Sequence, residues 1–140
     1  MGRDRNYRPI FVLKSSRLLE MNPIPTSEVL TKIMIIQFEY VRKYMMINGK
    51  IENVLLVIDS SGNNVFTLPY GLLNKSIAAI QLNYRGVARS VFILNAPKTF
   101  AYAWKTISYF LDESTARKVQ ISNSESTPDL IDLVAPNQLE

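Results

Sequence analysis

The chain contains neither cysteine nor histidine, and these two absences exclude several kinds of site at once. Without cysteine there can be no disulfide, no thiolate nucleophile and no thiol metal ligand. Without histidine there can be no Ser-His-Asp triad and no ordinary zinc or non-haem iron site. The Gly-x-Ser-x-Gly signature of α/β-hydrolases does not occur either. We therefore expect a protein that is not an enzyme and that uses no metal or other cofactor.

Long apolar runs are missing as well. The longest candidates, Ile33–Ile36 and Val54–Ile58, are far shorter than the roughly 20 residues that span a bilayer. The N-terminus has no apolar core of a signal peptide. Its sixth residue is Asn6, where a myristoylation signal has Ser or Thr. We expect a cytoplasmic protein.

What the chain does contain is typical of one globular domain. It has 140 residues, of which 47% are hydrophobic and 20% charged. The last eighteen residues hold four acids and no base, so the preceding part has 16 bases against eight acids, about +8. This charge favours solubility or an anionic partner such as lipid headgroups. No nucleic-acid-binding motif accompanies it, so we expect no nucleic acid partner.

Strands and helices are predicted to alternate along the chain. The apolar run Val54–Ile58 is typical of a strand that is covered on both faces. The predicted strands are 9–15, 53–60, 90–95 and 118–122, and the predicted helices are 27–48, 69–83, one from Pro97 and one at 129–134. This order predicts a single α/β domain over residues 1–140, with a mostly parallel, mixed sheet and flanking helices. Residues 1–6 and 135–140 are expected to be flexible ends.

The helix predicted over 27–48 carries more apolar residues than one narrow stripe requires. We expect them to form a wide apolar face against the sheet. They are Val29, Leu30, Ile33, Met34, Ile36, Phe38, Val41 and Met45.

The segment from Arg89 to Ser122 is the most informative part of the sequence. After a strand and a break at Pro97, apolar residues recur at steps of three and four, which predicts an amphipathic helix with Pro97 in its first turn. The segment contains landmarks in a fixed order, namely Asn95-Ala96-Pro97, Phe110-Leu111-Asp112, Thr115 and Lys118. This segment resembles the CRAL-TRIO lipid-binding domain, the family of the yeast phosphatidylinositol/phosphatidylcholine transfer protein.

Further similarities extend the resemblance over about residues 7–134. They are Tyr7–Val12, Phe38-Glu39-Tyr40, Ile58–Gly62 and Asn83-Tyr84. The resemblance implies an apolar pocket that holds a phospholipid or other lipophile beneath a helical gate, here Lys98–Tyr109 with the following turn. The apolar gate and pocket residues would be Phe100, Trp104, Ile107, Phe110 and Leu111. Periodicity alone favours the alternative that Phe100, Trp104 and Ile107 fill a closed core together with Met34, Met45 and Met46, and the motif match reverses this preference.

Polar candidates for the headgroup site each have an alternative. Lys118 could bind a lipid phosphate or lie on the surface. Ser60 and Ser61, at a strand's carboxyl end, could bind a ligand or form a turn. Tyr40 and Tyr44 could offer hydroxyls or simply pack. Four basic residues could face an anionic membrane peripherally or be isolated charges: Arg85, Arg89, Lys98 and Lys105.

Departures from the family pattern indicate a divergent minimal member or a domain taken from a longer protein. Gly86 stands where the family has an acidic residue that helps to hold inositol, so we expect weak inositol selectivity. We also expect this domain to differ from the family in the helical bundle that precedes the domain and in the Gly-Gly segment that follows its last helix, since the printed sequence shows neither. We expect a non-catalytic lipid-binding or lipid-transfer domain. The alternative is a protein-interaction module on the same fold with a collapsed pocket, binding a small GTPase or forming homo-oligomers.

Overall fold

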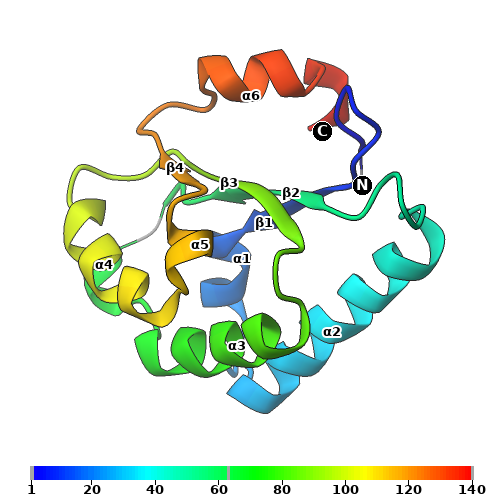
Figure 1. Ribbon diagram of the computed structural model, residues 1–140. Coiled ribbons are helices and arrows are strands. Elements are labelled where there is room, and N and C mark those ends of the chain that lie inside the picture. The colour runs from blue at the N-terminus through cyan, green and yellow to red at the C-terminus, as the bar shows by residue number, and fades with distance from the viewer. Residues whose placement is uncertain (1, 63, 140) are drawn as a thin grey trace.

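The structure is a computed structural model that describes residues 2–62 and 64–139, and it confirms an α/β domain built on one sheet (Figure 1). The strands are β1 (Ile10–Lys14), β2 (Val54–Asp59), β3 (Ala88–Leu94) and β4 (Val119–Ile121). They lie in the order β1-β2-β3-β4, and each is parallel to its neighbour. All four predicted strands are found. A mixed sheet would also include an antiparallel strand pair, but all three of these strand pairs are parallel.

Six α-helices and three short 3₁₀ helices lie in the described part of the chain. The α-helices are α1 (Ser15–Glu20), α2 (Ser27–Tyr44), α3 (Tyr70–Asn83), α4 (Phe100–Ile107), α5 (Glu113–Ala116) and α6 (Pro128–Leu133). The 3₁₀ helices are η1 (Val65–Thr67), η2 (Ser108–Phe110) and η3 (Pro136–Gln138). The side chains of Thr26 and Thr127 cap α2 and α6 by accepting hydrogen bonds from backbone N–H groups.

The helices form two unequal layers on the sheet. Helices α2, α3 and α4 lie on one face, and α6 covers the other together with the chain ends (Figure 1). Consecutive parallel strands joined by right-handed crossovers place their connecting helices on the same face, as is seen here. The α4 face of the sheet therefore carries the elements expected to form the gate.

The sheet contributes a hydrophobic core to each layer because alternate residues of a strand point to opposite faces. On one face, the buried core consists of Ile10, Leu55, Val57, Phe92 and Leu94 from the strands with Leu130 and Val134 from the α6 segment. On the other, Val91 and Ile93 pack against Phe100 and Ala103 of α4. Phe11 and Val54 pack against Phe38 and Val41 of α2 on the same side.

Helix α4 begins three residues later than predicted. The N–H of Ala96 donates to the carbonyl of Ser122 (2.9 Å), so the chain is still tied to β4 when it reaches Pro97. Pro97 then lies in a turn, where its carbonyl accepts from the N–H of Phe100 (2.8 Å). The prediction that Pro97 occupies the first turn of the helix is wrong for this reason. Helix α1 was not predicted, and it follows β1 without a break.

The two ends of the described chain meet beside α6. The N–H of Arg5 donates to the carbonyl of Leu133 (2.8 Å), and the N–H of Arg3 donates to Oε1 of Gln138 (3.0 Å). Asp4 is buried and accepts hydrogen bonds from Arg8. The flexibility expected of residues 1–6 and 135–140 stays a prediction, with residues 1 and 140 outside the described part.

Candidate functional site

The candidate gate is the segment α4–η2, whose inner side is apolar. Phe100 is only 6% exposed and, with Ala103, packs on β3. Trp104 and Ile107 are half-buried against the same cluster. On the outer side, Tyr109 is 81% exposed, which is unusual for so large a ring. The gate is therefore held to the sheet by few fully buried side chains.

An open hollow of about 360 Å³ lies between the start of α4 and strand β4. It is lined by Ala96, Pro97, Lys98, Phe100, Ala101, Trp104, Ile121 and Asn123. Its surface is mostly apolar, and its volume falls at the lower end of the range for small-molecule sites. Two of the predicted gate residues, Phe100 and Trp104, thus line an actual depression. Phe110 and Leu111 are half-buried beyond the other end of α4.

The carboxyl ends of β1, β2 and β3 carry a polar group centred on Asp59. Its Oδ1 accepts from Nδ2 of Asn95 (2.9 Å) and from the N–H of Ser61 (3.0 Å). The hydrogen bond from Asn95, more than that from Ser61, lowers the pKa of Asp59. Asn95 has a left-handed backbone (φ 53°), a conformation that Asn tolerates better than most residues. Ser60 is buried beside it, and Ser61 is exposed.

Lys118 lies at the opposite end of the sheet. It is half-buried just before β4, and its Nζ donates to the carbonyl of Ala88 (3.0 Å). From the strand register, Lys118 is level with Ser90 whereas Ser60 is level with Asn95. Five residues of strand separate these levels, about 16 Å. The structure therefore does not bring Lys118 together with Ser60 and Ser61.

Tyr40 and Tyr44 are on the outer side of α2, away from the gate. Their rings contact each other with centroids 5.0 Å apart, and both are more than half exposed. They do not face the sheet, because Phe38 and Val41 occupy the inner side of the helix. This position does not support the prediction that Tyr40 and Tyr44 bind a headgroup in a pocket under α4. The expected wide inner face of α2 is also wrong for Val29, Ile33 and Ile36, which are exposed.

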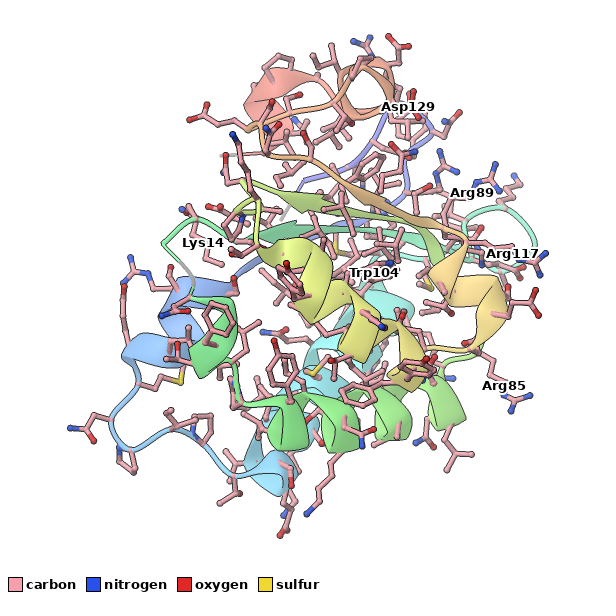
Figure 2. The ribbon with its side chains drawn as sticks, turned by 90° about the vertical axis from the view of Figure 1, so that its left-hand side faces the viewer. Lys14, Arg85, Arg89, Trp104, Arg117 and Asp129 are labelled. Atoms are coloured by element: carbon pink, nitrogen blue, oxygen red, sulfur yellow. The ribbon has the colours of Figure 1, made fainter. Side chains whose placement is uncertain are left out.

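The basic candidates fall into two groups. Arg85 and Arg89 point outward near the amino ends of the strands, and Arg117, which sequence reasoning did not single out, extends outward on the same side (Figure 2). Lys98 lies in the turn before α4, and Lys105 lies within α4. The signal that could have identified Arg117 was its position beside Lys118.

Gly86 has a backbone conformation that suits glycine. Its φ of 71° lies in the left-handed region, which glycine enters at no steric cost. Its carbonyl accepts from Nδ2 of Asn53 (3.3 Å), which joins this turn to the residue before β2. The turn thus takes a form that an acidic side chain would strain.

Nothing in residues 2–62 and 64–139 adds a metal or membrane-spanning feature. This part of the chain contains no cluster of acidic side chains suited to a metal ion. It also has no helix that is long and apolar enough to cross a bilayer.

Comparisons with known proteins agree with the observed fold. The family model described as the CRAL/TRIO domain matches residues 1–140. The crystal structure of Sfh5 superposes with a TM-score of 0.73 at 16% sequence identity, covering 81% of this chain and 41% of that one. This chain thus spans well under half the length of Sfh5, and the likeness at this identity shows the fold. With the family model matched from end to end, the chain belongs to the CRAL/TRIO domain family.

Proposed function

We propose that this domain holds a phospholipid or another lipophile beneath α4–η2 and exchanges it with membranes without catalysing a reaction. The observation that carries the proposal is the apolar hollow beside the gate, lined by Phe100 and Trp104. A hollow of about 360 Å³ admits part of a lipid, and a two-chain phospholipid requires the gate to move outward. Loading is therefore coupled to displacement of α4.

The free energy gained by burying part of a lipid chain is large enough to offset the cost of moving α4. Lifting α4 exposes Phe100, at a cost of about 1.5–3 kcal/mol. Each acyl CH₂ that enters the apolar space contributes about 0.8 kcal/mol relative to water. A few methylenes thus offset the opening. Since the bilayer offers the same gain, exchange between protein and membrane can approach balance.

The headgroup phosphate is proposed to lie at the Lys118 end of the gate. An ammonium has three N–H donors, so a phosphate can be bound alongside the carbonyl of Ala88. At the other end of the gate, the lowered pKa keeps Asp59 ionised, and its charge opposes a phosphate near Ser60 and Ser61. Those two serines are proposed to meet neutral parts of the ligand.

Peripheral contact with an anionic membrane is proposed to involve basic residues around the gate. Arg85 and Arg89 lie at the Lys118 end, and Lys98 and Lys105 belong to the gate segment. Each exposed cation contributes about 1 kcal/mol near an anionic surface and less as ionic strength rises. The exposed ring of Tyr109 on the gate suits the interfacial region of a bilayer.

Lipid content is the direct test. We expect native mass spectrometry of the purified protein, with extraction and identification of what it carries, to show one lipophile per chain. We also expect transfer of phosphatidylcholine between vesicles, with little preference for phosphatidylinositol because Gly86 replaces the acidic residue. A protein that carries no lipid and transfers neither lipid would refute the proposal.

A second candidate function is a protein-interaction module on the same fold. The observation in its favour is the closed packing of Phe100 and Ala103 against β3, which leaves only an open hollow at the gate. In that case neither lipid would be carried, and the fold would bind a small GTPase or a similar partner. The lipid assays above separate these two functions.

A further inference from the structure

The outward side of α2 carries a continuous apolar stripe that the proposed lipid function does not use. Its members recur at steps of four, three, four and four residues, which keeps them on one side of a helix. They are Val29, Ile33, Ile36, Tyr40 and Tyr44, and each is between 41% and 68% exposed. The helix has 18 residues, of which only Phe38 and Val41 are buried. At 100° per residue, the centre of the stripe lies about 160° from Phe38 and about 100° from Val41.

Charged residues of alternating sign run along one flank of this stripe. At 100° per residue, Glu28, Lys32, Glu39 and Lys43 fall within a 60° arc beside it, in the order acid, base, acid, base. The other flank carries uncharged Leu30 and Gln37. A helix that faced only solvent would need no apolar stripe, and a helix that faced an anionic bilayer would carry mainly bases. Within one chain Lys32 pairs with Glu28 (2.7 Å) and Arg42 pairs with Glu39 (2.6 Å), and both pairs are exposed, so a partner with the same alternation can join them.

We propose that the stripe binds a second copy of this chain, with the two α2 helices antiparallel about a two-fold axis. When Ile33 lies against the partner's Ile36, the same register sets Val29 against the partner's Tyr40. It also brings Lys32 beside the partner's Glu39 on the charged flank. The two-fold axis produces each of these contacts twice. A parallel pairing would instead set the charged flank of one helix against the uncharged flank of the other.

A hollow at the end of the stripe fits the same arrangement. It measures about 430 Å³ and is lined by Glu39, Tyr40, Arg42, Lys43, Tyr44 and Asn48. In the antiparallel register, the residues that precede α2 in the partner lie level with Tyr44. They include Ile24, which is 47% exposed. The hollow thus faces a half-exposed apolar side chain of the partner.

The proposed dimer is independent of lipid binding and is tested by mass. One helix from each copy buries less surface than a standard interface, so the dimer should form reversibly with rising concentration. In sedimentation equilibrium, we expect the mass to rise from 16.0 kDa toward twice that value. Ile36→Asp places charges beside the two-fold axis and should raise the dissociation constant at least about tenfold. The matched control is Leu82→Asp, because Leu82 on α3 is 75% exposed and Ile36 is 68% exposed. This control should leave the dissociation constant unchanged.

Mixing two variants tests the register. Alone, Lys32→Glu sets Glu against the partner's Glu39, and Glu39→Lys sets Lys against the partner's Lys32, so each should dimerise less than the wild type. Mixed in equal amounts, they restore both opposite-charge pairs in the heterodimer, and dimerisation should return. Glu39 also accepts from the hydroxyl of Tyr84 (2.7 Å), so circular dichroism must show that Glu39→Lys is folded. Glu28→Lys mixed with Lys43→Glu repeats the test at residues that do not contact Tyr84.

Two results would overturn the proposal. One is a mass of 16.0 kDa at every concentration in the folded wild-type protein. The other is a dimer that Ile36→Asp leaves intact and that the mixed variants do not restore. If Ile36→Asp instead reduced binding to phosphatidylserine vesicles by a monomeric protein, the stripe would be a membrane surface, and the dimer would again be refuted.

Discussion

Shortening the two large gate side chains, Phe100 and Trp104, should separate packing from gating. Both lie on the inner side of α4 in the same cluster as Val91 and Ile93. Both line the open hollow, but Phe100 is almost fully buried whereas Trp104 is only partly buried. We therefore expect Phe100→Ala and Trp104→Ala to differ in cost, although tryptophan is the larger residue.

The magnitudes follow from burial. Phe→Ala in a closed core costs about 3–5 kcal/mol, because apolar contacts are lost and a cavity remains. For Trp104 part of the ring is already in water, and the cavity opens to solvent, so we expect about 1–3 kcal/mol. With a total stability of about 5–15 kcal/mol, the first variant should be marginal and the second folded.

Urea unfolding followed by circular dichroism measures both costs, since Trp104→Ala removes the chain's single tryptophan. The matched control is Tyr102→Ala, on the outer side of the same helix at 73% exposure, and we expect a change within about 0.5 kcal/mol. In the wild type, Trp104 fluorescence should shift when vesicles are added, because its surroundings change as the gate opens.

Equal costs for the two variants would mean that Trp104 belongs to a closed core. A Trp104 spectrum that stayed the same with neutral and with anionic vesicles would remove the argument for a membrane-responsive gate. Either result would favour the protein-interaction module.

Three further predictions test single residues. Lys118→Ala should reduce transfer of anionic phospholipid at low and at raised salt, because salt screens a shielded ion pair only a little. Arg85→Ala should reduce this transfer at low salt only, because Arg85 is exposed. Normal transfer by Lys118→Ala would remove Lys118 from the site. The pKa of Asp59 is lower in the folded than in the unfolded state, so its stabilising contribution is present above about pH 4 and lost as pH falls below it. Acid titration of the unfolding free energy should therefore be shallower for Asn95→Ala than for the wild type, and an equal slope would contradict the hydrogen bond. Gly86→Ala should destabilise the fold by about 1 kcal/mol, because φ is positive at this position, and Gly86→Asn should destabilise it by less. An unchanged Tm for Gly86→Ala would show that the turn adopts another backbone conformation without cost.

Local patterns in the sequence were sufficient for most elements. The continuous apolar run Val54–Ile58 predicted a strand covered on both faces, and β2 has that environment between α6 and the α2 layer. The alternation of strands and helices predicted the parallel sheet. The signals around Asn95-Ala96-Pro97 and Lys118 identified the family. Each of these features depends on residues that are neighbours in the chain.

Contacts between distant residues decided what the sequence could not. The start of α4 depends on the bond from Ala96 to Ser122. The expected headgroup set is divided because Lys118 precedes its strand whereas Ser60 follows its own, and parallel strands place those positions at opposite ends of a sheet. Periodicity shows that Ile36 shares a helix side with its neighbours, but not whether that side meets the sheet. The sequence alone therefore determined the strands, the longer helices, their order and the family, because these follow from local periodicity and motifs. Only the tertiary structure decided which faces are covered and which polar groups meet, because α2 has apolar residues on more than one side and the sheet covers only one of them.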